Sequence, residues 1–188
     1  MLNTQLKLSD VTKDYLTRYY EILDEMIEGM TKVELTDSIS HNFIVQMIPH
    51  HRAAIAMSEN LLRFTTNVAL QDIAIRIITE QTKSIQEMEK ALEHCSHFCN
   101  TQQELYLYQR CYQQVITLMF RDMKSACADN DINEDFIKEM VPHHMGAIYM
   151  SENALRFPIC PQLTPLLQAI ITSQTAGVQE MNQLLKEL

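Results

Sequence analysis

A 22-residue stretch occurs twice in this chain, and the repeat constrains the fold more than any other feature. Residues 43–64 and 136–157 align without a gap at an offset of 93 residues, and 15 of the 22 positions are identical. Both copies read Met-x-Pro-His-His and continue to Ala-Ile-x-Met-Ser-Glu-Asn. Repetition of this kind is typical of a fold made from units that cannot bury their hydrophobic faces alone. We therefore expect two internal repeats, over about 9–95 and 101–188, that pack as one domain over 1–188.

Hydrophobic periodicity predicts three helices in each repeat. Leu16, Tyr19 and Leu23, for example, have the three- and four-residue spacing of one buried helix face. The residues Thr101 and Glu104 have the spacing of a capping box, which marks a helix start. The predicted helices span about 9–32, 38–64, 68–94, 101–127 and 133–157, and a sixth begins at Thr164, which caps it, with Pro165 at the first position.

Composition supports the same fold class. Only 3 of the 188 residues are Gly, and the helix-favouring residues Leu, Ile, Met, Gln and Glu are abundant. The predicted fold is an all-α helical bundle built from two three-helix repeats with pseudo-two-fold symmetry. We expect the second and fifth helices near the axis, because they hold the strongest part of the repeat.

Five methionine pairs recur at the same offset of 93 residues. Met used only for packing is readily exchanged for Leu or Ile because it is flexible and unbranched. Its retention at every paired position therefore indicates that sulfur matters as well as volume. The pairs are Met26 with Met119, Met30 with Met123, Met47 with Met140, Met57 with Met150, and Met88 with Met181.

The repeated motif places soft metal ligands on one helix face. Met47, His50, His51 and Met57 share a broad face by their spacing. Thioether and imidazole together favour Cu(I), whereas zinc prefers thiolate, imidazole or carboxylate, and calcium needs oxygen ligands. The predicted Cu(I) ligands are Met47, His50, His51, Met57 and Met88 and their partners Met140, His143, His144, Met150 and Met181, with Met26, Met30, Met119 and Met123 as further candidates.

Two polar residues interrupt otherwise apolar helix faces. Gln81 and Gln174 each lie on a predicted buried stripe. Because a buried polar group needs a partner, we expect each to hold an imidazole N–H by a hydrogen bond.

A proline precedes each His pair inside a predicted helix. A proline in this position removes one hydrogen bond and costs roughly 3 kcal/mol. Because both Pro49 and Pro142 are kept, we predict a bend at each that aims the following imidazoles.

A different cluster has no copy in the other repeat. His94, Cys95, His97 and Cys99 lie close together in the chain, and they are predicted either to form a second metal site, with Cys160 as an extra ligand if the loops meet, or to be a helix end with incidental cysteines. The five cysteines are an odd number in a chain large enough to fold without disulfides, so we expect mainly reduced thiols. Cys111 and Cys127 are predicted to be small core residues.

The repeated motif resembles the domain of unknown function 305 family. The resemblance covers 43–92 and 136–185 and includes the second pattern Ile-Ile-x-x-Gln, followed by Met seven residues after the Gln. It implies a ferritin-like bundle that binds copper through Met and His, at the ten principal ligands named above. The family includes a periplasmic copper-binding protein, and many of its members are exported. The first ten residues lack the apolar core of a signal peptide, so the expected compartment is the cytoplasm as the sequence stands, or the periplasm or exterior if a leader has been removed.

The predicted function is Cu(I) sequestration, storage or transfer, with the metal ion and a copper chaperone or exporter as partners. The alternatives are a copper- or non-haem-metal oxidoreductase and a structural helical module without metal. The net charge of −9 without a basic cluster argues against nucleic acid as a partner. No apolar run approaches the roughly 20 residues of a membrane-spanning helix. Because imidazole must be neutral to bind a metal, we expect Cu(I) affinity to fall as the pH drops through about 6.5.

Overall fold

A computed structural model of the chain describes residues 7–95, 97–126 and 128–188. All regular secondary structure in these residues is helical, which confirms the predicted all-α class. The six helices are α1 (Asp10–Thr31), α2 (Ile39–Leu62), α3 (Val68–Cys95), α4 (Gln102–Lys124), α5 (Ile132–Ala154) and α6 (Thr164–Leu184).

The helix starts follow from local capping chemistry. The hydroxyls of Ser9 and Ser38 accept hydrogen bonds from backbone N–H groups in the first turns of α1 and α2. Both bonds of the capping box between Thr101 and Glu104 are present at the start of α4.

Three predicted boundaries were wrong. The helix α5 ends at Ala154 instead of extending to about residue 157. The helix α4 ends at Lys124 instead of extending to about residue 127, and Cys127 itself lies outside the described residues. Thr164 does not cap α6, because it is already the first helical residue. The cap position holds Leu163, whose side chain is fully buried, so this position serves core packing instead of capping.

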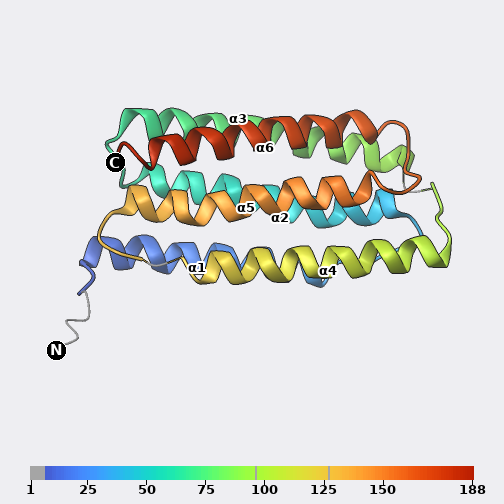
Figure 1. The fold of residues 1–188 in the computed structure, drawn as a ribbon, viewed down its shortest axis with the longest axis horizontal. Coiled ribbons are helices and arrows are strands. Elements are labelled where there is room, and N and C mark those ends of the chain that lie inside the picture. The colour runs from blue at the N-terminus through green and yellow to red at the C-terminus, as the bar shows by residue number, and fades with distance from the viewer. Residues whose placement is uncertain (1–6, 96, 127) are drawn as a thin grey trace.

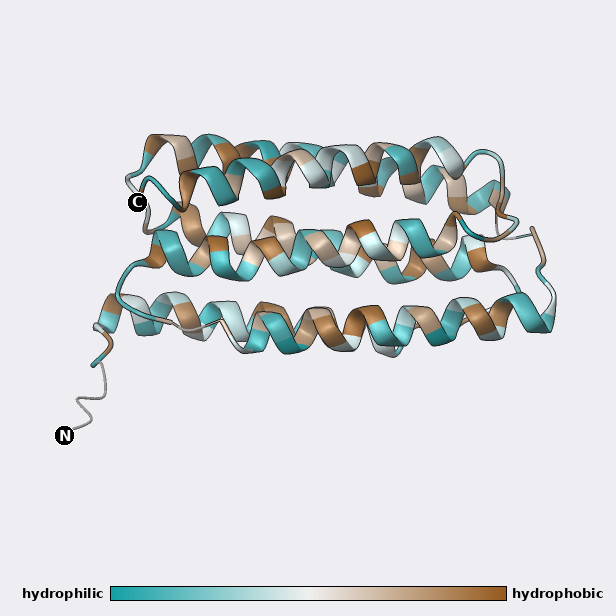
Figure 2. Ribbon diagram, viewed as in Figure 1, coloured by the Kyte–Doolittle hydropathy of each residue, from teal (hydrophilic) through white to brown (hydrophobic). Residues whose placement is uncertain are grey.

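The helices form three layers of two (Figure 1). The helices α2 and α5 lie in the middle, between α3 with α6 on one side and α1 with α4 on the other. Hydrophobic and hydrophilic residues alternate along each ribbon in Figure 2, as expected for amphipathic helices. One hydrophobic core draws residues from all six helices. The two helices that carry the Pro-His-His motif, α2 and α5, are therefore covered by other helices on both sides.

Hydrogen bonds join the two repeats in pairs: a bond from the first repeat to the second has an equivalent from the second to the first. The Tyr15 hydroxyl donates to the Glu139 carboxylate at 2.6 Å, and the equivalent Tyr108 hydroxyl donates to the side-chain amide oxygen of Gln46 at 3.4 Å. A second pair shows the same exchange, from the Tyr19 hydroxyl to the Met123 carbonyl and from the Tyr112 hydroxyl to the Met30 carbonyl. In each case the two donors are 93 positions apart in the sequence, and so are the two acceptors. A pseudo-two-fold relation between the repeats produces this pattern.

The helices α2 and α5 continue through their internal prolines. The bend predicted at each proline stays a prediction. Pro49 also has a packing role that the sequence did not reveal. A Cβ placed on Gly29 of α1 would lie 2.7 Å from the Cβ of Pro49, so the proline requires a glycine opposite it.

Glu139 is expected to make stability depend on pH, because burial raises its pKa well above the usual carboxyl value despite the Tyr15 hydrogen bond. The contribution of the Glu139 carboxyl to stability is complete below pH 4.5, its ordinary pKa, because the group is then neutral in both the folded and the unfolded state. Between pH 4.5 and the raised pKa of the folded state, stability falls by up to about 1.4 kcal/mol per pH unit, because only the unfolded state releases the proton freely. Gln46 makes the equivalent bond in the other repeat, so a glutamine can replace Glu139 without losing it. Because the amide does not titrate, Glu139→Gln should unfold at a higher urea concentration than wild type at pH 8, with a smaller difference at pH 5.

The reverse substitution is the control for this prediction. Gln46→Glu should introduce the same pH-dependent loss of stability in the other repeat, where Tyr108 would face the new carboxyl. If urea midpoints of Glu139→Gln and wild type differ equally at both pH values, the carboxyl of Glu139 is not held in its raised-pKa state.

Candidate metal centre

Four buried imidazoles form a row through the middle layer. In the order His51, His50, His143, His144, the ring centroids are separated by 6.0, 3.7 and 6.0 Å. The central pair comes from α2 and α5, where the two helices meet. Each ring is at most 2% exposed. The two His pairs predicted as separate sites in the two repeats are therefore brought together into one row.

Reciprocal hydrogen bonds define the protonation of the central pair. The Nε2 of His50 lies 3.2 Å from the carbonyl of His143, and the Nε2 of His143 lies 3.1 Å from the carbonyl of His50. A carbonyl only accepts, so each Nε2 carries a proton and the Nδ1 of each neutral ring has a free lone pair.

The Nδ1 atoms of all four rings are buried without a hydrogen-bond partner among the described residues. Buried polar atoms are nearly always paired, so a group of four unpaired nitrogens in one row needs an explanation. An ion would bind the free Nδ1 lone pair of His50 or His143, because unprotonated imidazole nitrogen is a common metal ligand. In neutral His51 and His144, whichever ring nitrogen lacks the proton could bind one.

Burial keeps these imidazoles neutral. Desolvation lowers the pKa of His51 to about 3 and that of His143 to about 4, and it lowers the pKa values of His50 and His144 well below their usual range. The expected titration near pH 6.5 is therefore wrong for these rings, because that value belongs to a solvated imidazole.

The paired methionines are all buried in the same core. Each is at most 3% exposed. No three His, Cys, Asp or Glu side chains of the described residues come close enough together to share an ion. An ion at the imidazole row would therefore take at most two of these nitrogens and would need thioethers to complete its coordination. The buried set comprises Met26, Met30, Met47, Met57, Met88, Met119, Met123, Met140, Met150 and Met181.

Met119 makes an unusually close contact with the backbone of α5. A Cβ placed on Gly146 would overlap the Met119 sulfur. The glycine thus lets this thioether approach the helix backbone beside the second repeat of the motif.

Gln81 and Gln174 do not have the predicted role. Their Oε1 atoms are buried and unpaired among the described residues, and the described hydrogen bonds join neither to an imidazole. His51 instead pairs through Nε2 with the hydroxyl of Ser84 at 3.1 Å. Both glutamines line the cavity above His51, so they face this site without bonding to the ring.

Two cavities between α3 and α6 open onto the outer imidazoles. One, of about 180 Å³, is lined by His51 and Ser84, and the other, of about 300 Å³, is lined by His144 and Gly177. These linings correspond at the 93-residue offset, which aligns Ser84 with Gly177. The sequence shows that a serine in one repeat is replaced by a glycine in the other, but only the structure shows that both residues lie beside an imidazole.

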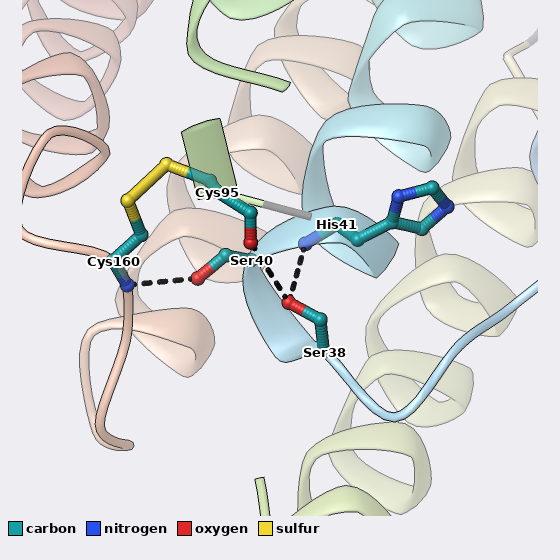
Figure 3. Close-up of a disulfide and its surroundings, with 5 residues drawn as sticks. All are labelled: Ser38, Ser40, His41, Cys95 and Cys160. Carbon is teal, nitrogen blue, oxygen red and sulfur yellow. Dashed lines mark hydrogen bonds between the residues drawn. A yellow bond between two sulfur atoms is a disulfide. The ribbon is translucent and has the colours of Figure 1, made fainter. Parts of the chain in front are cut away.

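The cysteine prediction was wrong in one essential respect. Cys95 and Cys160 form a disulfide between the end of α3 and the loop before α6, with Cα atoms 5.4 Å apart. Figure 3 shows the start of α2 beside it: the Ser40 hydroxyl accepts from the Cys160 N–H at 2.9 Å, and the Ser38 hydroxyl donates to the Cys95 carbonyl at 3.2 Å. The loops do meet, as the sequence reading allowed, but they meet through a covalent bond instead of a shared metal.

The remaining members of the cysteine and histidine cluster are exposed. His94, His97 and Cys99 lie at the surface, and Cys95 has no thiolate to offer while it is in the disulfide. The predicted second metal site therefore lacks a ligand set in the described structure. Cys111 is a free thiol that is half-buried, not a core residue.

The fold and the site define a class of protein: an all-α bundle whose interior contains both buried imidazoles and buried thioethers. No helix in the described ranges has a segment both long and apolar enough to cross a membrane. The sequence profile of the family described as domain of unknown function (DUF305) matches residues 24–92 and 40–185, and the chain belongs to this family.

The chain is also similar to solved structures of CopM. The silver-bound form obtained by soaking is 28% identical, with a TM-score of 0.58 over 82% of this chain and 98% of that chain. The apo form is 27% identical, with a TM-score of 0.57 over 79% and 96%. The silver-bound form obtained by co-crystallization is 26% identical, with a TM-score of 0.58 over 79% and 96%. No curated protein sequence matches the chain significantly.

Proposed function

We propose that this protein binds Cu(I) in its buried centre and serves to sequester, store or transfer it. The observation that carries the proposal is the row of four neutral imidazoles whose Nδ1 atoms are buried and unpaired among the described residues. Ten buried methionines belong to the hydrophobic core of the same bundle. Soft thioether and borderline imidazole ligands together favour Cu(I) over zinc, calcium or magnesium.

The similarity to CopM supports a monovalent soft ion. Two of the similar structures contain silver. Ag(I) resembles Cu(I) in charge and in preference for soft ligands, so a related fold that takes silver supports a Cu(I)-like site here.

Competition with a chromophoric Cu(I) chelator tests this proposal. The apo protein should withdraw Cu(I) from the chelator under ascorbate, and it should bind Zn(II) and Cu(II) more weakly because these ions gain little from thioethers. We expect at least two ions per chain, since the ligands recur in two repeats. A structural module without metal would leave the chelator complex unchanged, and an oxidoreductase would consume oxygen with ascorbate as the bound metal turned over.

Cu(I) affinity is expected to be nearly independent of pH between 7.5 and 5.5. Thioethers do not titrate, and burial lowers the pKa of His51 to about 3 and that of His143 to about 4. A lowered pKa means that protons compete with the metal only near and below pH 4. Chelator competition at several pH values checks this expectation. A tenfold loss of affinity between pH 7.5 and 5.5 would mean that solvated imidazoles hold the ion.

The compartment and partner are part of the proposal. The Cys95–Cys160 disulfide supports an oxidising compartment such as the periplasm, where such bonds persist. A copper chaperone or exporter is the partner that a transfer role would require. Thiol trapping of the protein directly from cells would test the compartment, because a reduced pair in vivo would contradict it.

A further inference from the structure

The two outer imidazoles of the row have different neighbours, although the repeats place them alike. The Nε2 of His51 lies 3.1 Å from the Ser84 hydroxyl. At the equivalent position, His144 faces Gly177, and a Cβ on Gly177 would lie 3.2 Å from Nε2 and 3.0 Å from Cδ2 of His144. A side chain at residue 177 would therefore lie against the ring, as Ser84 does against His51.

The position over His144 opens onto a cavity. His144 is 98% buried, since only 2% of it is exposed, and it lines the cavity of about 300 Å³ together with Gly177. The described hydrogen bonds include none to the Nε2 of His144, and this nitrogen, unlike the four Nδ1 atoms, is not among the fully buried unpaired atoms. The His144 ring lines the cavity between α3 and α6, with its Nε2 beside Gly177.

A partly exposed ion pair lines this cavity. It joins Arg76 of α3 to Glu180 of α6, and the two side chains are 45% and 47% exposed. Exposed pairs of this kind contribute little to stability, because water screens them. The pair therefore does not seal the cavity against a small cation.

We propose that the two repeats take up metal unequally: the cavity between α3 and α6 admits a soft monovalent cation to the Nε2 of His144, while Ser84 occupies the equivalent nitrogen of His51. Gly177 is the residue that keeps the first position open, and Ser84 is a positioning residue that closes the second. An ion that binds the Nε2 of His51 must first break its hydrogen bond to Ser84. This inference rests on the proposed Cu(I) function and adds the order in which its two halves fill.

Nuclear magnetic resonance of the histidine rings tests the inference. In protein labelled with ¹⁵N at histidine, long-range ¹H–¹⁵N spectra report Nδ1 and Nε2 of each ring, and Ag(I) is a diamagnetic probe for Cu(I). Wild type should show the His144 Nε2 signal responding at lower Ag(I) than that of His51, with an apparent affinity about five-fold tighter, the equivalent of one net hydrogen bond. The substitution Ser84→Gly should make the two rings respond together, and Gly177→Ser should weaken the response of His144.

A matched control separates this effect from a loss of helix stability. Ser173→Gly makes the same change on α6, at a serine that lines both cavities but bonds to the Ile170 carbonyl instead of an imidazole. It should leave the order of response unchanged. In the metal-free protein, Ser84→Gly should shift the His51 Nε2 signal and leave the His144 signal in place.

The outcomes are distinct. If His51 and His144 respond together in wild type, or if Ser84→Gly leaves their order unchanged, the inference is overturned while the Cu(I) proposal stands. If no ring of the row responds to Ag(I), both the inference and the proposed function are wrong.

Discussion

Replacing Met47 and Met140 together by Leu is expected to leave the fold intact and to lower Cu(I) affinity by at least about tenfold. Both side chains are fully buried, and Met-to-Leu exchange conserves volume, so the loss of stability should stay below about 1.5 kcal/mol. Removing the sulfur takes away a soft ligand that an imidazole cannot replace, because no three His, Cys, Asp or Glu side chains of the described residues meet to hold an ion. A tenfold loss of affinity corresponds to about 1.4 kcal/mol.

Chelator competition measures this effect, and the chain supplies its own control. Met145 has no partner in the first repeat, where the equivalent residue is Arg52. It lines a cavity between α4 and α5 and is only half-buried. Met145→Leu should therefore keep wild-type affinity. If the double variant at Met47 and Met140 also keeps it, these two sulfurs fill space in the core and the ion lies elsewhere.

Removing the Cys95–Cys160 disulfide is expected to cost roughly 4 kcal/mol of unfolding free energy. The two cysteines are 65 residues apart in the chain, and closing a loop of that length removes much conformational freedom from the unfolded state. For a protein of this size, that loss corresponds to a fall in Tm of roughly 8–16 °C. Thermal unfolding of the double variant Cys95→Ala/Cys160→Ala, followed by circular dichroism, measures it.

The free cysteines provide the comparison for this variant. Cys99 is exposed and Cys111 is half-buried, and neither is in a disulfide. Ala at either position should leave Tm within about 2 °C of wild type, because surface changes have small effects on stability. Reduction of wild type should lower Tm as much as the double variant does. A reduced protein as stable as the oxidised one would mean that the bond adds nothing to the fold.

Much of the fold could be predicted from the sequence because its determinants are local. Side-chain periodicity and capping depend on residues three or four positions apart, so the six helices and the Thr101 cap of α4 followed directly. The repeat at an offset of 93 residues also indicated that His50 and His143 occupy equivalent places. The ligand types at the candidate centre follow from residue chemistry alone, which needs no coordinates.

The tertiary structure decided which equivalent residues touch. His50 and His143 bond to each other's carbonyls because α2 packs on α5, and nothing in either repeat by itself specifies that crossing. The same packing excludes water from the rings, and this desolvation lowers their pKa values instead of leaving them near 6.5.

Long-range loop contacts decided the rest. Cys95 ends α3 and Cys160 lies in the loop before α6, and only the packing of α3, α6 and the start of α2 brings them together, so spacing in the sequence could not pair them. Ser84, and not Gln81, reaches the ring of His51, because the exact rotation of α3 against α2 selects one of two polar residues three positions apart. Sequence determines which side chains lie on a helix face, whereas contact between helices depends on how those faces fit together.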